Sequence, residues 1–160
     1  MDIKNKSQFI EYFLKGIKKP NQLKIGVEHE RFLFEGQNKK RISYITLKKL
    51  FENLKQNGWE PLFEKENIIG MKRDNQQITT EPGLQCELSG APLDNIHQVC
   101  AESSKFLKEI EAASIGLDIN TVSIGFDPFN NLSDIPKSPK QRYKIMTSEM
   151  PKGGSQSLEM

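Results

Sequence analysis

Four glutamates stand within or at the ends of segments that alternate like β-strands: Glu28 and Glu30 in GVEHE, Glu81 in TTEPG, and Glu87 in CELSG. Two carboxylates about 4 Å apart repel by roughly 4 kcal/mol at an effective dielectric near 20, so a cluster on a half-buried sheet needs a cation. Hard oxygen ligands without neighbouring Cys or His pairs suit magnesium, which commonly lies between a few carboxylates and the phosphates of a nucleotide. The sequence therefore predicts that the four glutamates bind magnesium and a nucleotide.

A plainer interpretation of the first pair is that Glu28 and Glu30 form a solvated outer face, the more common situation for a Glu-x-Glu strand. Glu87 favours the functional interpretation, because it repeats the same arrangement in a second strand whose partner face is apolar. His29 points to the face opposite the two glutamates, so we expect a core or supporting histidine rather than a metal ligand.

Three cationic side chains are candidates for contacts with a substrate. Lys72 and Arg73 precede a hairpin turn and could meet a phosphate or a substrate carboxylate, although a solvated turn flank is the more common outcome. Arg142 lies in PKSPKQRYKIM, which we expect to be a rigid Pro-rich loop that aims the guanidinium at a substrate carboxylate. The alternative for Arg142 is an ordinary surface arginine. Neither a glycine-rich phosphate loop nor a Ser, His and Asp arrangement occurs.

Hydrophobic periodicity predicts the elements that must position these side chains. We expect helices over residues 7–18, 46–57 and 94–114, a hairpin over 68–73 and 76–81, and further strands over 23–34, 84–89 and 119–126. Asp94 is the expected N-cap of the third helix, and no closing helix is expected after Pro139. Strands outnumber those of a parallel βαβ chain, so the predicted class is α+β, an antiparallel β-sheet with flanking helices.

Bulk properties exclude several classes of protein. The chain of 160 residues has a net charge of +2, and its lysines are interleaved with apolar residues, so we expect no nucleic-acid partner. No apolar run approaches the roughly 20 residues of a membrane span, and the N-terminus lacks a signal-peptide pattern. Cys86 and Cys100 have neither metal-site nor disulfide-framework spacing. We therefore expect no membrane association and a soluble cytoplasmic protein with reduced thiols.

Longer segments of the sequence resemble a known family. GVEHERF, IIGMKRD with ITTEPGLQCELSGAPL, HQVCAE, IGFDPF, DIPKSPKQRYKIM and MPKGGSQSLEM occur in the order found in glutamate–cysteine ligases of the plant and proteobacterial type. The resemblance covers nearly the whole chain from Ile25 onward. Since members of that family are much longer, we expect residues 1–160 to be the N-terminal part of a single, incomplete catalytic domain.

The resemblance implies a fold similar to glutamine synthetase, with a sheet that surrounds ATP, Mg²⁺ and L-glutamate. It also implies the first step of glutathione synthesis, in which ATP phosphorylates the γ-carboxylate of glutamate and the amine of L-cysteine displaces phosphate. Phosphoryl transfer of this kind depends mainly on positioning and on cations that neutralise charge. The implied small-molecule partners are therefore L-glutamate, L-cysteine and ATP, and the oligomeric state cannot be predicted.

Carried over by position, the four glutamates match the acidic residues of the family motifs, and Arg142 matches the arginine of the RYxIM segment. Cys100 matches a cysteine that forms a redox-linked disulfide in plant relatives, but the sequence lacks the downstream partner. The EPGGQFE of many relatives reads EPGLQCE here, with Leu84 and Cys86 substituted and the acidic residues retained.

Two alternatives to this ligase remain open at this point. One is another glutamate– or carboxylate–amine ligase of the same superfamily with a different amine acceptor. The other is a non-catalytic binding module that retains the motifs as remnants. Coding sequence that continues past Met160 with further strands would favour the enzyme, whereas a stop codon there would favour the remnant.

Overall fold

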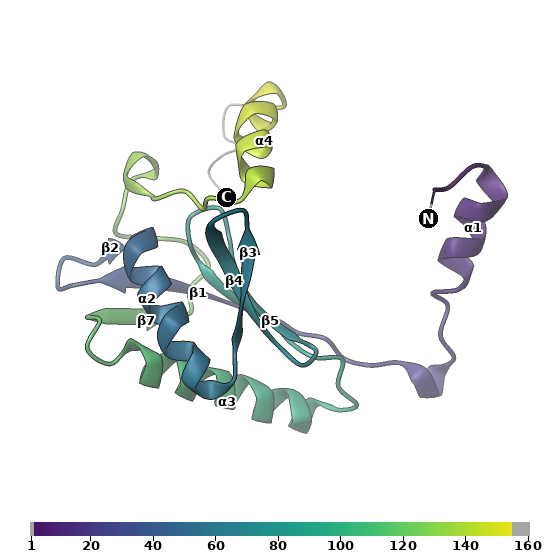
Figure 1. The fold of residues 1–160 in the computed structure, drawn as a ribbon, viewed down its shortest axis with the longest axis horizontal. Coiled ribbons are helices and arrows are strands. Elements are labelled where there is room, and N and C mark those ends of the chain that lie inside the picture. Colours follow the sequence, from purple (N-terminus) through teal and green to yellow (C-terminus); the bar gives the residue numbers. More distant parts are fainter. Residues whose placement is uncertain (1, 155–160) are drawn as a thin grey trace.

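The structure is a computed structural model that describes residues 2–154, and it has a curved antiparallel sheet with two long helices against one face (Figure 1). The predicted α+β class with an antiparallel sheet is confirmed. The helices are α1 (Lys6–Leu14), α2 (Tyr44–Leu54), α3 (Ile96–Ser114) and α4 (Gln141–Glu149). The strands are β1 (Glu28–Glu35), β2 (Lys40–Arg41), β3 (Glu60–Glu64), β4 (Asn67–Arg73), β5 (Gln76–Thr80), β6 (Cys86–Ser89) and β7 (Ile119–Val122). Short 3-10 turns η1 to η4 cover Pro20–Gln22, Lys55–Asn57, Leu132–Asp134 and Met150–Lys152.

The strand order is β2-β1-β6-β5-β4-β3, and β7 also pairs with β1. Strand β1 is the centre of the arrangement, because its first half pairs with β6 and its second half with β7. The predicted hairpin is confirmed as β4 and β5, with Asp74 of the connecting turn at a φ of 51°. Strand β5 stops at Thr80 because the chain turns tightly there, and the Glu81 N–H bonds to the Gln85 carbonyl at 2.9 Å.

The hydrophobic core lies between the sheet and the helices α2 and α3. Met71, Ile78 and Leu88 are fully buried on neighbouring strands, and each apolar side chain buried in this way contributes roughly 1.5–3 kcal/mol. The helical side of the core is formed by Leu47, Leu50, Phe51, Leu54, Phe106 and Ile110. This arrangement leaves the opposite face of the sheet free of the long helices.

Local signals explain where the two long helices begin and end. The Ser43 hydroxyl accepts from the Thr46 N–H at 3.2 Å and so caps α2, and Gly58 ends the following 3-10 turn with a φ of 81°. The predicted N-cap of α3 was wrong by one residue. The Asn95 side chain accepts from the Gln98 N–H at 3.0 Å, while Asp94 forms an ion pair with Lys24.

Three elements were missed or placed differently by the sequence analysis. Strand β3 was not predicted because it contains Pro61, which is tolerated there since β3 is an edge strand. The expected absence of a helix after Pro139 is contradicted by α4, which begins two residues after that proline. Strand β7 ends at Val122 rather than residue 126. The MPKGGSQSLEM segment lies partly outside the described residues.

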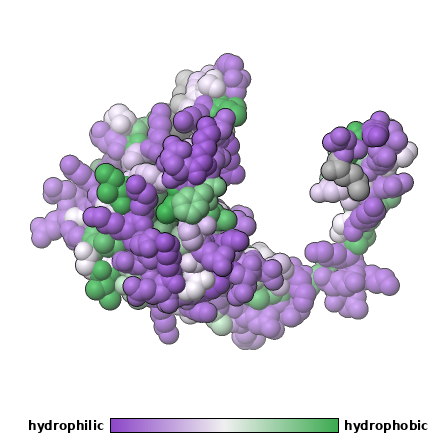
Figure 2. Space-filling model, viewed as in Figure 1, coloured by the Kyte–Doolittle hydropathy of each residue, from purple (hydrophilic) through white to green (hydrophobic). Residues whose placement is uncertain are grey.

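Helix α1 stands apart from the rest of the molecule (Figures 1 and 2). The predicted helix over residues 7–18 is present but shorter, and none of its residues is buried. Its apolar side chains, including Phe9 and Phe13, are exposed, since no surface of the described residues covers them. The periodicity thus predicted the helix correctly but not a partner for its apolar face.

Leu84 occupies a backbone conformation that side chains other than glycine rarely adopt. Its φ is 61°, which for an L-residue costs roughly 1–2 kcal/mol, and its side chain is fully buried in the core. Burial of a leucine side chain offsets that cost. The turn after β5 therefore keeps its shape with leucine at this position.

One end of the sheet face opposite α2 and α3 is closed by a loop after β7. Phe32 lies under the Arg41 guanidinium, 4.6 Å from its ring centroid, and Phe34 meets Phe129 edge to face at 5.4 Å. Arg41 is buried and reaches Asp127 at 3.4 Å and the Gly83 carbonyl. The open part of this face therefore begins beyond Phe32, at the positions of the predicted acidic residues.

Candidate functional site

The register of the sheet brings the acidic side chains of β1 and β6 to its open face. Glu30 is paired with Glu87, which is paired with Thr79, and in the next row Glu28 is paired with Ser89. Directly paired residues of antiparallel strands point to the same face. Because the alternate residues of β5 and β6 belong to the core, these side chains point away from α2 and α3.

A cavity of about 490 Å³ lies over this face. Its lining side chains come from β1, β3, β4, β5, the turn after β5, β6 and the start of α4. They are Glu28, Leu62, Glu64, Ile69, Gln77, Thr79, Glu81, Glu87, Ser89, Lys140 and Arg142. Four carboxylates and two cationic groups thus share one concavity.

The carboxylate of Glu87 is held by hydroxyl groups on one oxygen only. Its Oε1 accepts from the Ser89 hydroxyl at 3.0 Å and from the Thr79 hydroxyl at 3.4 Å. Within residues 2–154, Oε2 of Glu87 has no hydrogen-bond partner and no cation lies within 4 Å of the group. One oxygen is therefore available to a ligand.

Glu30 lies beside the cavity, where the carboxylates of Glu81 and Glu87 repel its negative charge. Partial burial raises the pKa of the Glu30 carboxyl, and the charges of Glu81 and Glu87 raise it further, while Arg41 acts in the opposite direction. A raised pKa means that the ionised form is disfavoured in the folded chain. A cation bound among these groups would relieve that repulsion.

The start of α4 forms the cationic rim of the cavity. The Thr80 carbonyl accepts from the Lys140 ammonium at 2.7 Å and from the Tyr143 hydroxyl at 3.1 Å. Arg142 donates to the Tyr143 hydroxyl at 2.6 Å, and its guanidinium lies 3.7 Å from the Glu81 carboxylate. The hydrogen bond from Arg142 to Tyr143 raises the pKa of Arg142, whereas burial lowers the pKa of Lys140. These contacts fix α4 against the end of β5.

The structure brings together Glu28, Glu81, Glu87 and Arg142, with Glu30 next to them. Arg142 reaches the site from the first turn of α4, and the expected Pro-rich loop ends before it. The histidine between the two glutamates of β1 is paired with Leu88 and so belongs to the opposite face, as predicted.

Lys72 and Arg73 are not brought to the cavity together. Lys72 shares the open face but is exposed and lies 3.4 Å from Glu60. Arg73 points into the helical side, where it bonds to Glu109 at 2.8 Å and stacks on Trp59 at 4.2 Å. Placing both at one site was wrong for Arg73, because successive residues of a strand point to opposite faces.

Two residues of the rim were missed by the sequence analysis. Lys140 and Tyr143 are both buried, although each carries a polar group at the cavity or next to it. Their only sequence signal is the spacing K-x-x-Y after a proline, which places both on one face of a helix once the helix itself is recognised.

The donor set of the cavity is compatible with a cation that also contacts a ligand. Within residues 2–154, no group of three or more His, Cys, Asp and Glu side chains is arranged to hold a metal ion on its own. Magnesium is usually bound by one or two carboxylates together with substrate phosphates and water. The mutual repulsion at Glu30 and the open oxygen of Glu87 fit that mode of binding.

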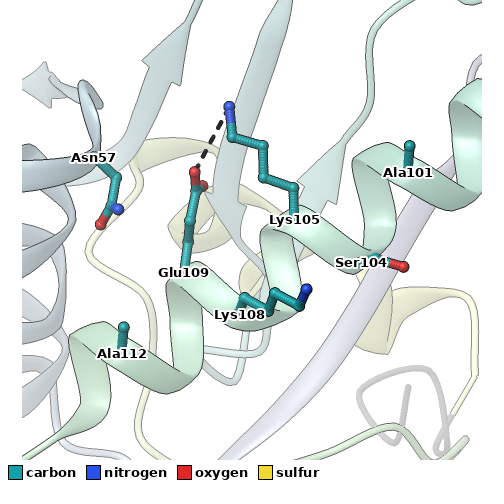
Figure 3. Close-up of a pocket in the computed structure, with 7 residues that line it drawn as sticks. All are labelled: Asn57, Ala101, Ser104, Lys105, Lys108, Glu109 and Ala112. Atoms are coloured by element: carbon teal, nitrogen blue, oxygen red, sulfur yellow. Dashed lines mark ion pairs between the residues drawn. The ribbon is translucent and has the colours of Figure 1, made fainter.

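A second, open depression of about 350 Å³ lies on α3, away from the carboxylate face (Figure 3). Glu109 points across it toward Lys105, at 3.9 Å, while Ala101, Ser104 and Lys108 follow the helix. The Glu109 carboxylate also accepts from the Trp59 indole N–H at 2.9 Å. Its acid is thus already neutralised within the chain.

Comparison with known proteins decides the family. The model of glutamate-cysteine ligase family 2 (GCS2) matches residues 24–160. The chain belongs to this family. Glutamate–cysteine ligase A, chloroplastic, of Oryza sativa subsp. japonica is 41% identical over 156 residues, which are 97% of this chain and 32% of that protein. The chloroplastic glutamate–cysteine ligases of Medicago truncatula and Arabidopsis thaliana are 40% and 39% identical, with 31% and 30% of their lengths covered.

The chain therefore spans about a third of the length of these members of the family. The expectation of a cytoplasmic protein is contradicted, because these relatives are named chloroplastic. Composition could not make this distinction, since both compartments are aqueous. Among the described residues, no helix has the length and apolar character needed to cross a membrane.

Proposed function

We propose that this chain forms one part of the active site of an ATP-dependent glutamate–cysteine ligase. The reaction would join the γ-carboxylate of L-glutamate to the amine of L-cysteine through a γ-glutamyl phosphate, giving γ-glutamylcysteine, ADP and phosphate. The observation that carries the proposal is the cavity itself. It combines two carboxylates without an ion-pair partner among residues 2–154, Glu28 and Glu87, with a cationic rim. Membership of the family supports the choice of reaction.

The carboxylate side of the cavity is the proposed place of the magnesium–nucleotide. Glu28, Glu30, Glu81 and Glu87 would hold it, with Oε2 of Glu87 as the open oxygen described above. Mg²⁺ at this place would supply the positive charge that phosphoryl transfer requires at the phosphate oxygens.

The rim is the proposed place of the substrate carboxylate. The side chain of Arg142 is 63% exposed and its pairing with Glu81, at 3.7 Å, is loose enough to admit a second partner. The bond to Tyr143 fixes the direction of the guanidinium, so a carboxylate can be bound in a defined orientation. Lys72 lies farther out on the same face and is assigned an auxiliary contact.

We also propose that residues 1–160 are the N-terminal part of a single catalytic domain. The sheet has β3 at one edge, and the apolar face of α1 is exposed, so both are available for contact with further chain. The ATP and cysteine contacts that the cavity lacks would come from that further chain.

The test replaces the matched third of the rice ligase with this chain and assays the chimera for ADP and γ-glutamylcysteine. Several amines other than cysteine are assayed in parallel, because a different acceptor is the main alternative. The expected result is ligation that depends on both glutamate and cysteine, with the unmodified rice enzyme as control. A chimera that melts cooperatively but releases neither product would contradict the proposal.

A further inference from the structure

Of the two cationic residues that line the cavity, Lys140 is buried and Arg142 is largely exposed. Lys140 is only 7% exposed, yet it lines the cavity beside Glu81 and Glu87. Its backbone is fixed by the preceding Ser138, whose N–H donates to the Pro82 carbonyl at 2.8 Å and whose hydroxyl lies 3.1 Å from that of Thr80. The position of the ammonium is therefore set by the fold rather than by solvent.

The Lys140 ammonium is incompletely satisfied. It has three N–H donors, and its one hydrogen bond within residues 2–154 goes to the Thr80 carbonyl at 2.7 Å. In that part of the chain no carboxylate lies within the 4.0 Å of an ion pair, although Glu64, Glu81 and Glu87 act on it from farther away. The ring of Tyr143 lies 5.5 Å from the charge, and the positive charge of Arg142 also acts on it. Buried ammonium groups are normally paired, so a partner is missing.

We infer that Lys140 binds an anionic oxygen of the ligand in this cavity, either a carboxylate or a phosphoryl oxygen. The inference rests on the function proposed for the same cavity. A ligand oxygen would occupy a second donor of Nζ while the first stays on Thr80. Because the floor of the cavity is acidic, the ligand must carry positive charge as well, which fits an amino acid with its ammonium group or a nucleotide with its magnesium.

Lys140 and Arg142 would then have different tasks. Arg142 is largely exposed and already pairs with Glu81, whereas Lys140 is buried and has no paired acid among residues 2–154. A buried charge meets its ligand without the screening that weakens an exposed one. Lys140 would therefore contribute more to affinity, and Arg142 more to orientation.

The experiment uses nuclear magnetic resonance of the lysine side chains in the 160-residue chain, a method that detects weak binding. One titration adds L-glutamate and a second adds Mg-ATP. The expected result is a saturable shift of the Lys140 side-chain resonances, with the exposed Lys144 of the same helix unchanged. A shift with glutamate alone identifies a carboxylate, and a shift with Mg-ATP alone identifies a phosphoryl oxygen.

Matched variants separate ligand binding from support of the fold. Lys140→Gln keeps a donor for the Thr80 carbonyl but removes the charge. The substitution should lower the affinity for the ligand at least about tenfold. Lys140→Arg should retain most of the affinity, and Lys144→Gln should leave it unchanged. Thermal melts of all variants establish that they are folded.

The inference is overturned if neither ligand shifts Lys140, or if Lys140→Gln binds as tightly as the original chain. Failure of the proposed function is a separate result. A folded chimera that makes no γ-glutamylcysteine, combined with a saturable Lys140 shift, would reject the ligase and retain the anion site.

Discussion

Glu109 and Glu87 lie on opposite sides of the same sheet, and their carboxylates differ in how they are paired within the chain. Glu109 is buried on the helical side, where Arg73 lies at 2.8 Å and the Trp59 indole N–H at 2.9 Å. Glu87 on the open side accepts from two hydroxyl groups of the described residues, both on one oxygen. The difference is that the charge of Glu109 is paired within the chain, whereas Glu87 keeps one oxygen that a ligand could bind.

The same contrast holds for the cationic groups. Arg73 is a half-buried guanidinium with its acid beside it, while Lys140 is a buried ammonium without one among the described residues. A sheet with one core face and one open face allows this division, because neighbouring residues on each strand face different environments.

The largest expected effect is loss of the pair on the helical side. Arg73→Ala leaves Glu109 buried without its nearest cation, and such a change typically destabilises a protein by about 3–5 kcal/mol. Urea unfolding of the 160-residue chain measures it. Lys72→Ala is the matched control on the same strand, and its exposed pair with Glu60 should cost no more than about 1 kcal/mol. Equal effects of the two substitutions would show that burial does not distinguish them.

The next effect concerns activity rather than stability. Glu87→Gln in the rice chimera removes a charge from the cavity but keeps an oxygen that can accept from Ser89. Turnover should fall by about a hundredfold or more, while the unfolding midpoint stays near that of the chimera. Product formation and thermal melts are measured on the same samples. Glu28→Gln is expected to behave similarly. Near-normal turnover in both variants would contradict the proposed role of these carboxylates in binding the magnesium–nucleotide.

The smallest effect has the opposite sign. Because the pKa of Glu30 is raised in the folded chain, ionisation of Glu30 costs stability as the pH rises through that pKa. Glu30→Gln should therefore stabilise the chain near pH 7, by less than about 1 kcal/mol because the group is partly exposed. The gain in stability should vanish at a pH well below 4.5, the ordinary pKa of a glutamate, because the carboxyl is then protonated in both the folded and the unfolded chain. Unfolding at several pH values tests this, and destabilisation at pH 7 would contradict it.

Much of the fold was predictable because local signals and tertiary structure agree. The α2 boundary follows from its apolar periodicity and the Gly58 cap, and the β4–β5 hairpin follows from its Asp-Asn turn. The shared face of Glu28, Glu30 and Glu87 follows from strand alternation and register together. At these positions, residues close together in the sequence are enough to predict the local structure.

Other features depend on contacts that no local pattern reveals. The buried state of Lys140 and Tyr143 arises from the Thr80 carbonyl, about 60 residues earlier in the chain. Strand β3 exists because an edge tolerates Pro61, and an edge is known only when the sheet is assembled. Lys72 and Arg73 were named together as candidate ligand contacts, although strand alternation alone places them on opposite faces. That error could have been avoided from the sequence.

We expect the ligand to bind at the carboxylate face of the sheet and not at the helical face. Backbone amide shifts of the 160-residue chain during a titration with Mg-ATP test it most directly. We predict weak binding, shifts confined to the β1, β5, β6 and α4 residues that line the cavity, and no release of ADP when glutamate and cysteine are added. Shifts centred on the α3 depression around Glu109, or ADP release by this chain alone, would contradict the account.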